Sequence, residues 1–178
     1  MLPPPKINSD RLVIRAVQKK DAAAIYQYRS HPDVCRFQPW RPQSASEVEA
    51  FIDSSLLIPW DMPNTRHQLA VCLKDGTLIG DLGIHFLDEY QVEIGYTLSP
   101  DFQGLGYACE AVRALVDYFF KAMKKHRVTA SVEPDNAKSV KLLEKLGFRE
   151  EAHFVKSFRM DDRWTDDCIY AMLAEDWR

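Results

Sequence analysis

The chain has 178 residues, 46% of them hydrophobic and 28% charged, which is typical of a single globular domain spanning residues 1–178. Its formal net charge of -3 offers no broad basic surface, so we expect no binding to a nucleic-acid backbone or to an anionic membrane. No apolar run approaches the roughly 18 residues of a membrane span, and the first residues lack a signal-peptide core, so a cytoplasmic location is expected.

The first half of the chain is predicted to contain a strand, two helices and a hairpin. Asp21 is placed to cap the first helix, and Ser44 and Glu47 have the spacing of a capping box before the second. Asp75-Gly76 is a strong turn dipeptide and predicts a hairpin between the last two strands of this half. The expected strands are residues 11–17, 68–73 and 78–86.

The second half is predicted to contain four further strands and two helices. Apolar residues between Val112 and Met123 recur at helical intervals and indicate one helix. A second helix is expected to begin at Asn136 and to end at Gly147, which suits a left-handed cap. The expected strands are residues 91–98, 127–132, 151–158 and 168–173.

The strand at residues 91–98 carries an informative pattern. Side chains alternate between the two faces of a strand, so Glu93, Gly95 and Thr97 are expected on one face. The opposite face takes the larger residues, Val92, Ile94, Tyr96 and Leu98. A carboxylate is therefore expected on the same face as a glycine and a threonine.

A segment of small residues leads from this strand into the next helix. It consists of Gln103, Gly104, Leu105, Gly106, Tyr107 and Ala108. The first N–H groups of a helix have no intrahelical partner and the helix dipole favours an anion, so the segment suits a pyrophosphate. Its two glycines permit a positive φ and close approach of a ligand. A tight strand-to-helix turn is the alternative, and no Lys-Ser or Lys-Thr follows that would make it a Walker A loop.

This segment matches the Q/R-x-x-G-x-G/A loop, and on it the chain resembles the Gcn5-related N-acetyltransferases (GNAT superfamily). Further motifs in the same order resemble the branch that acetylates ribosomal-protein alanine, namely residues 9–15, 20–22, 95–100, 136–139 and 144–148. The resemblance implies an α/β fold with a mixed, mostly antiparallel sheet of seven strands and about four helices. Its fourth and fifth strands, residues 91–98 and 127–132, would splay apart to admit the pantetheine arm of acetyl-CoA.

The resemblance also suggests catalytic roles for named residues. Glu93 would help to remove the proton of the amine, and the backbone N–H groups near Thr97 and Leu98 would hold the developing oxyanion. The wider family often places a tyrosine at the position of Leu143, which leaves no phenol there. Ser139, one helical turn earlier, is the serine that the branch uses beside the thiolate, although a thiol with a pKa near 8.5 needs little help. A solvated strand residue and a surface serine are the alternatives for Glu93 and Ser139.

The cofactor-binding set implied by the resemblance is larger than the glycine segment. It contains Thr97, Leu98, Gln103, Gly104, Leu105, Gly106, Tyr107, Ala108, Asn136 and Ser139. Asn136 is also placed to cap its helix. No metal is expected, since the four cysteines are far apart and have no nearby histidine pair. The five histidines have no ligand spacing and are assigned no chemistry.

The predicted function is transfer of acetyl from acetyl-CoA to a primary amine, preferably a peptide or protein N-terminus. A small amine, such as a polyamine or an antibiotic, and a non-catalytic acyl-CoA sensor are the alternatives, and a homodimer is a family expectation. Phe37, Trp40 and Trp60 fall where the family builds one wall of the acceptor groove, although packing suffices for most of them. The final hairpin holds four carboxylates that would attract a cationic amine or simply form a solvated turn: Asp161, Asp162, Asp166 and Asp167.

Overall fold

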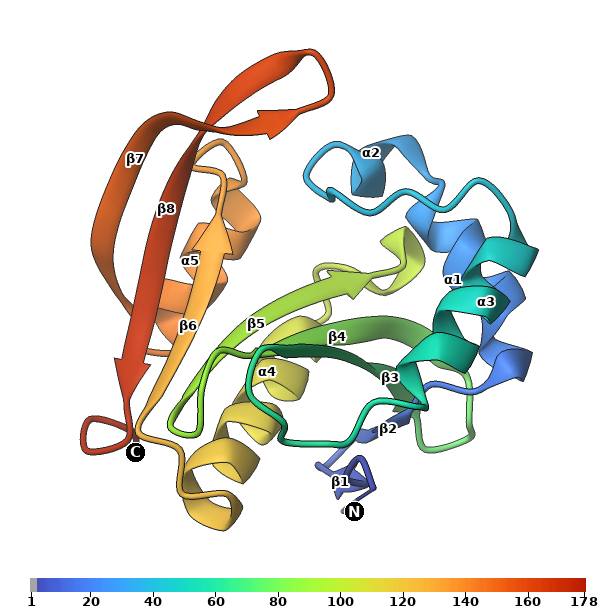
Figure 1. Cartoon of the computed structure of the whole chain (residues 1–178), viewed down its shortest axis with the longest axis horizontal. Helices are drawn as coiled ribbons and strands as arrows, with labels where there is room; N and C mark the ends of the chain where they lie inside the picture. The colour runs from blue at the N-terminus through green and yellow to red at the C-terminus, as the bar shows by residue number, and fades with distance from the viewer. Residues whose placement is uncertain (1–2) are drawn as a thin grey trace.

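The computed structural model describes residues 3–178, and one mixed sheet runs through the whole fold (Figure 1). The strands lie in the order β1-β2-β3-β4-β5-β6-β8-β7, and every neighbouring pair is antiparallel except β5 and β6. Their bounds are β1 (Ile7–Asn8), β2 (Leu12–Ala16), β3 (Thr65–Leu73), β4 (Leu78–Phe86), β5 (Gln91–Leu98), β6 (Arg127–Val132), β7 (Arg149–Met160) and β8 (Arg163–Leu173). The sheet therefore has one strand more than predicted, because the two-residue β1 pairs with β2.

Helices cover both faces of this sheet. Helix α4 packs its apolar side against one face, whereas α1 and α3 form a smaller cluster with β3 on the other. The bounds are α1 (Ala22–Arg29), α2 (Pro32–Cys35), α3 (Ala45–Ser55), α4 (Tyr107–Asp117) and α5 (Ala137–Lys145). The prediction of four helices missed the single-turn α2. No helix within residues 3–178 is long and apolar enough to cross a membrane.

The predicted helix ends are largely confirmed. The Ser44 hydroxyl accepts a hydrogen bond from the Glu47 N–H, 3.1 Å away, at the start of α3. At α5 the side-chain oxygen of Asn136 accepts from the Ser139 N–H, and Gly147 follows the helix with a φ of +87°. Both helix ends are local hydrogen-bond patterns, which explains why the sequence revealed them.

The prediction that Asp21 caps the first helix is wrong. The Asp21 carboxylate forms a two-point ion pair with Arg15, at 2.7 and 2.9 Å, and accepts from the Gln18 N–H. It makes no capping bond to α1. Asp21 is buried, so its negative charge needs the compensation that the Arg15 guanidinium provides and that a cap by backbone N–H groups would not supply.

Strands β5 and β6 separate as predicted. They pair in parallel at only three positions, the last of which joins Glu93 to Thr129. Figure 1 shows β5 continuing along β4 while β6 turns away with β7 and β8. The end of each strand that lies beyond Glu93 or Thr129 therefore borders an opening in the sheet.

The final hairpin is longer than predicted. Strand β7 covers Arg149–Met160 instead of 151–158, and β8 covers Arg163–Leu173 instead of 168–173. Asp161 and Asp162 form the turn between them, whereas Asp166 and Asp167 lie within β8. The carboxylates are consequently divided between a turn and a strand.

Candidate active site

A cleft of about 560 Å³ lies on the sheet beside the point where β5 and β6 separate. Its floor includes Gly83 of β4 and Gly95 of β5, which are paired across the two strands. A Cβ on either glycine would meet nothing within 4 Å, so the absence of side chains hollows the floor. Next to the glycines, one cross-strand row joins β3, β4, β5 and β6 through Arg66, His85, Glu93 and Thr129.

The two walls of the cleft come from distant parts of the chain. The segment between α1 and α3 contributes Phe37 and Trp40, and the β7–β8 hairpin contributes Phe158 and Met160 on the far side. The Arg29 guanidinium lies 4.8 Å from the centre of the Trp40 ring, which helps to keep that ring in place. Both walls therefore present apolar side chains to the space between them.

Trp60, one of the three aromatic residues considered for the acceptor wall, belongs to the hydrophobic core instead. It is buried and packs edge-on against His67 and Phe86, with ring centroids 5.0 Å from each. Phe37 and Trp40 line the cleft instead. The wide opening between two apolar walls is large enough for part of a flexible acceptor.

Glu93 stands at the base of the opening, where the last β5–β6 pair ends. Its side chain is half-buried and lines the cleft, on the same face as Gly95 and Thr97, as the alternation predicted. A carboxylate here faces the space that a reacting amine would enter.

His85 is a candidate that the sequence analysis missed. It faces Glu93 directly across β4 and β5, and its buried ring nitrogen Nδ1 has no hydrogen-bond partner among residues 3–178. Burial lowers the pKa of His85, Arg66 lowers it further, and Glu93 acts in the opposite direction. The imidazole is therefore neutral at pH 7 and can accept a proton. His85 faces Glu93 because of the register of the β4–β5 hairpin. The spacing of histidines along the sequence does not reveal this register.

The glycine segment has the predicted backbone. Gly104 and Gly106 have φ values of +78° and +82°, and α4 begins immediately afterwards with no side chain capping it. Arg11, which the sequence analysis did not single out, donates to the Leu105 carbonyl at 3.0 Å and stacks 4.3 Å from the centre of the Tyr107 ring. The Arg11 guanidinium also pairs with Glu110 at 2.6 Å, so the fit to a pyrophosphate rests on the free N–H groups and the open Gly104.

Two long side chains connect this segment to the opening in the sheet. The amide of Gln103 donates to the Leu98 carbonyl at 3.1 Å, and Lys138 approaches the Gln103 oxygen at 3.4 Å. The N–H and C=O of one residue in a strand point the same way, so the Leu98 N–H also faces the opening. The Thr97 carbonyl points towards β4 instead. Its oxygen lies close to Gly80 of β4, where it would clash with a Cβ on that residue. Of the two expected oxyanion donors, the geometry favours Leu98.

Helix α5 borders the opening from the side of β6. Asn136, Ser139 and Leu143 all line the cleft, and Leu143 has no solvent-exposed surface. The position of Leu143 carries no phenol, but the Tyr96 hydroxyl reaches this helix from β5 and donates to the Ser139 carbonyl at 3.3 Å. Burial raises the pKa of Tyr96 to about 12, so its hydroxyl keeps its proton.

Comparison with known proteins agrees with this geometry. Residues 11–149 match the family described as "Acetyltransferase (GNAT) domain". The chain belongs to this GNAT acetyltransferase family. A solved GNAT-family acetyltransferase from Bacillus anthracis is 31% identical, covers 96% of this chain and 99% of its own, and superimposes with a TM-score of 0.86.

Two GNAT relatives with named substrates lie further away. The [ribosomal protein uS5]-alanine N-acetyltransferase of Escherichia coli is 25% identical over 99% of this chain and 94% of its own. The spermidine N(1)-acetyltransferase of Vibrio cholerae is 26% identical over 89% of this chain and 90% of its own. The family identifies the chain as an acetyl-CoA-dependent N-acetyltransferase, and these two relatives leave the class of acceptor open.

The hairpin carboxylates of this GNAT domain are less free than predicted. Asp161 pairs with Arg41 at 2.6 Å, and Asp167 accepts from the Ser131 hydroxyl at 2.6 Å. Asp166 lies 2.6 Å from a ring nitrogen of His153. Asp166 and Asp167 line the cleft, but their neighbours reduce the field that four unpaired carboxylates would have produced.

Proposed function

We propose that the chain transfers acetyl from acetyl-CoA to the α-amine of a peptide or protein N-terminus. The observation that carries this proposal is the shape of the cleft, which has a carboxylate on its floor between two apolar walls. A peptide offers side chains that such walls can hold, while its terminal amine reaches Glu93. An α-amine also has a pKa near 8, so it needs less help to lose its proton than an alkyl amine.

In this proposal Glu93 takes the amine proton, directly or through a water molecule, as the nitrogen attacks the acetyl carbon. His85 faces Glu93 and is neutral, so it can pass the proton on or keep the carboxylate ready for the next turnover. The two side chains act from adjacent strands, which fixes their separation without requiring a flexible loop.

The thioester is held from the other side. The Leu98 N–H would stabilise the negative charge that develops on the acetyl oxygen. The new C–N bond forms, the C–S bond breaks, and the sulfur takes up a proton from water or from a hydroxyl near Ser139. Tyr96 is one such hydroxyl, and Gln103 to Ala108 with Asn136 would hold the phosphate end of the co-substrate.

A small polyamine is the second candidate. Glu133 and Asp167 add carboxylates to the cleft beyond Glu93, and a polycation that displaced Arg163 from its pair with Glu133 could span them. The spermidine-acetylating relative from Vibrio cholerae supports this alternative. An acyl-CoA sensor would use the same cleft without turnover.

The test is a rate comparison with acetyl-CoA and three acceptors: a peptide with a free N-terminus, the same peptide with a blocked N-terminus and one internal lysine, and spermidine. We expect the free peptide to react fastest, with mass spectrometry locating the acetyl group on its α-amine. A faster reaction with spermidine would replace the proposal by the polyamine alternative. Binding of acetyl-CoA without turnover of any acceptor would indicate a sensor.

A further inference from the structure

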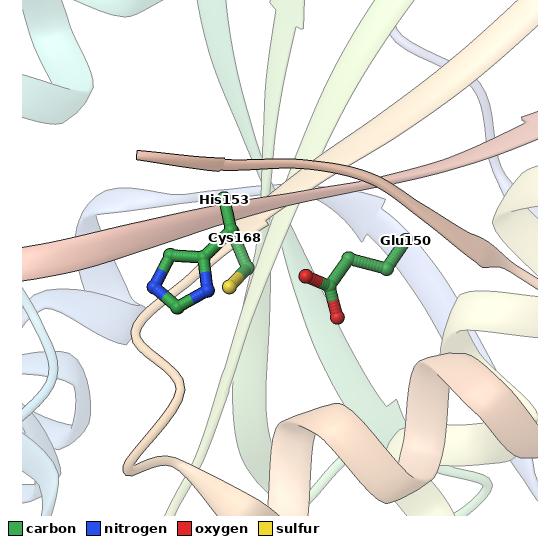
Figure 2. Close-up of side chains that lie close together, drawn as sticks. All are labelled: Glu150, His153 and Cys168. Atoms are coloured by element: carbon green, nitrogen blue, oxygen red, sulfur yellow. The ribbon is translucent and has the colours of Figure 1, made fainter. Parts of the chain in front are cut away.

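Three side chains of metal-ligand type converge on the β7–β8 hairpin, where the proposed acetyl transfer uses none of them. A carboxylate oxygen of Glu150, a ring nitrogen of His153 and the sulfur of Cys168 all lie within 4.8 Å of one another. Figure 2 shows the carboxylate and the imidazole on either side of the sulfur. Cys168 is buried, whereas the other two residues are exposed, so the group opens to solvent on one side.

A β-bulge brings these residues together. His153 is the direct cross-strand partner of Cys168, and Glu150 is paired with Tyr170, two positions further along β8. Residues three apart on a regular strand point to opposite faces, but the register shifts between Glu150 and Ala152. The extra residue, Glu151, returns Glu150 and His153 to one face. Bulges of this kind commonly redirect a side chain next to a functional site.

Two of these side chains, those of His153 and Glu150, also have hydrogen-bond partners. His153 Nε2 lies 2.6 Å from the Asp166 carboxylate, which leaves Nδ1, the nitrogen nearer the sulfur in Figure 2, for another partner. The Tyr170 hydroxyl donates to Glu150 at 3.2 Å. A histidine that binds a metal almost always has its other ring nitrogen held in this way, by a carboxylate or a carbonyl.

We propose that Glu150, His153 and Cys168 bind a divalent transition-metal ion of the zinc class. Thiolate, imidazole and carboxylate are the donors that zinc takes in proteins, whereas calcium and magnesium take oxygen donors. With bonds of about 2.0 to 2.3 Å at tetrahedral angles, donors on one zinc ion lie about 3.3 to 3.8 Å apart, so the three atoms must move closer when the ion binds. The exposed side chains of Glu150 and His153 can close the remaining gap by rotation, and water can take the fourth position.

The ion would fasten β7 to β8 and, through His153, hold Asp166 on the wall of the cleft. This inference stands independently of the acceptor and of acetyl transfer. It also explains why cysteine and histidine spacing gave no indication of a metal, since the three ligands are assembled by strand pairing and a bulge.

The test uses the full chain, reduced, stripped with a chelator and dialysed. We expect calorimetric titration with zinc to give one ion per chain, and cobalt to give a tetrahedral spectrum with a thiolate charge-transfer band. Cys168→Ser should remove that band, and Glu150→Gln or His153→Gln should weaken zinc binding by at least about ten-fold. Asp166→Asn should weaken it by about 10- to 100-fold while keeping the stoichiometry.

Glu151→Gln is the matched control, because Glu151 is the same residue type one position along and pairs with Arg127 and Arg149 instead. It should leave zinc affinity unchanged. Glu150 and His153 are exposed, so their variants test the site even if Cys168→Ser does not fold. Absence of one-to-one binding, or equal affinity in wild type and His153→Gln, would overturn the proposal.

Discussion

At the level of single residues, the proposed chemistry of the cleft rests on Glu93. We expect Glu93→Gln to keep the shape of the side chain and to lower turnover by about 10²- to 10⁴-fold, the usual loss when a general base is removed. The affinity for acetyl-CoA should barely change, because Glu93 is proposed to act on the acceptor amine. Steady-state rates and calorimetric binding measure the two effects, and wild-type rates in the variant would make Glu93 a structural residue.

His85 gives a prediction about pH. Burial lowers its pKa below the ordinary value of about 6.5, so the part of the pH–rate profile that His85 causes should be a decline below pH 6.5, separate from the effect of acceptor-amine protonation at higher pH. His85→Asn should lower turnover less than Glu93→Gln does and should remove that decline. The exposed His126→Asn is the control for a general loss of histidine. An unchanged pH–rate profile in His85→Asn would exclude a proton-handling role.

At the level of whole elements, the start of α4 is expected to bind the pyrophosphate. Acetyl-CoA at about 100 times its dissociation constant should stabilise the protein by about 2.7 kcal/mol, measured by thermal unfolding. Gly106→Asp should abolish this stabilisation, because it adds bulk and negative charge at a positive φ. Gly76→Asp introduces the same residue at a φ of +94° in a distant turn and should keep the stabilisation. An unchanged affinity in folded Gly106→Asp would contradict the assignment.

The β7–β8 hairpin gives a weaker, charge-dependent prediction. Asp167 lines the cleft, so Asp167→Asn should raise the KM for a cationic acceptor with little change in kcat. The difference should shrink at high salt, since such attraction is screened over roughly 8 Å at physiological ionic strength. Asp162→Asn, in the exposed turn, is the control. Identical KM values for wild type and Asp167→Asn at low salt would remove the hairpin from capture.

At the level of the whole molecule, hydrogen bonds and an ion pair of Asp81 connect α1 to the sheet. Its buried carboxylate accepts from Arg29 at 2.6 Å and from the Tyr28 hydroxyl, and it also contacts Gln68. Burial raises the pKa of Tyr28, and Asp81 raises it further, so the hydroxyl keeps the proton that it donates. Because Arg29 and Gln68 line the cleft, this network also positions one end of the site.

Breaking this network should therefore be costly. We expect Asp81→Asn to lower the free energy of unfolding by about 3 to 5 kcal/mol, because it leaves the Arg29 charge buried without compensation. Asp53→Asn breaks the exposed Lys19–Asp53 pair and should leave stability almost unchanged, because solvent screens the two charges. Urea denaturation compares the two variants, and equal small losses would show that the buried charge is compensated elsewhere.

Features that depend on neighbouring residues could be predicted from the amino-acid sequence alone. The Asp75-Gly76 hairpin, the caps at Ser44 and Asn136, and the positive φ of Gly106 all follow from local hydrogen bonds and sterics. The family resemblance added the separation of β5 and β6, which no local pattern encodes.

Which distant side chains meet depends on the folded chain. His85 faces Glu93 because of the β4–β5 register, and Tyr96 reaches Ser139 because β5 and β6 separate. Asp21 was mispredicted because its partner, Arg15, becomes available only when β2 and the following turn fold together. Cross-strand register and bulges depend on the partner strand, so a single segment of sequence contains too little information to specify them.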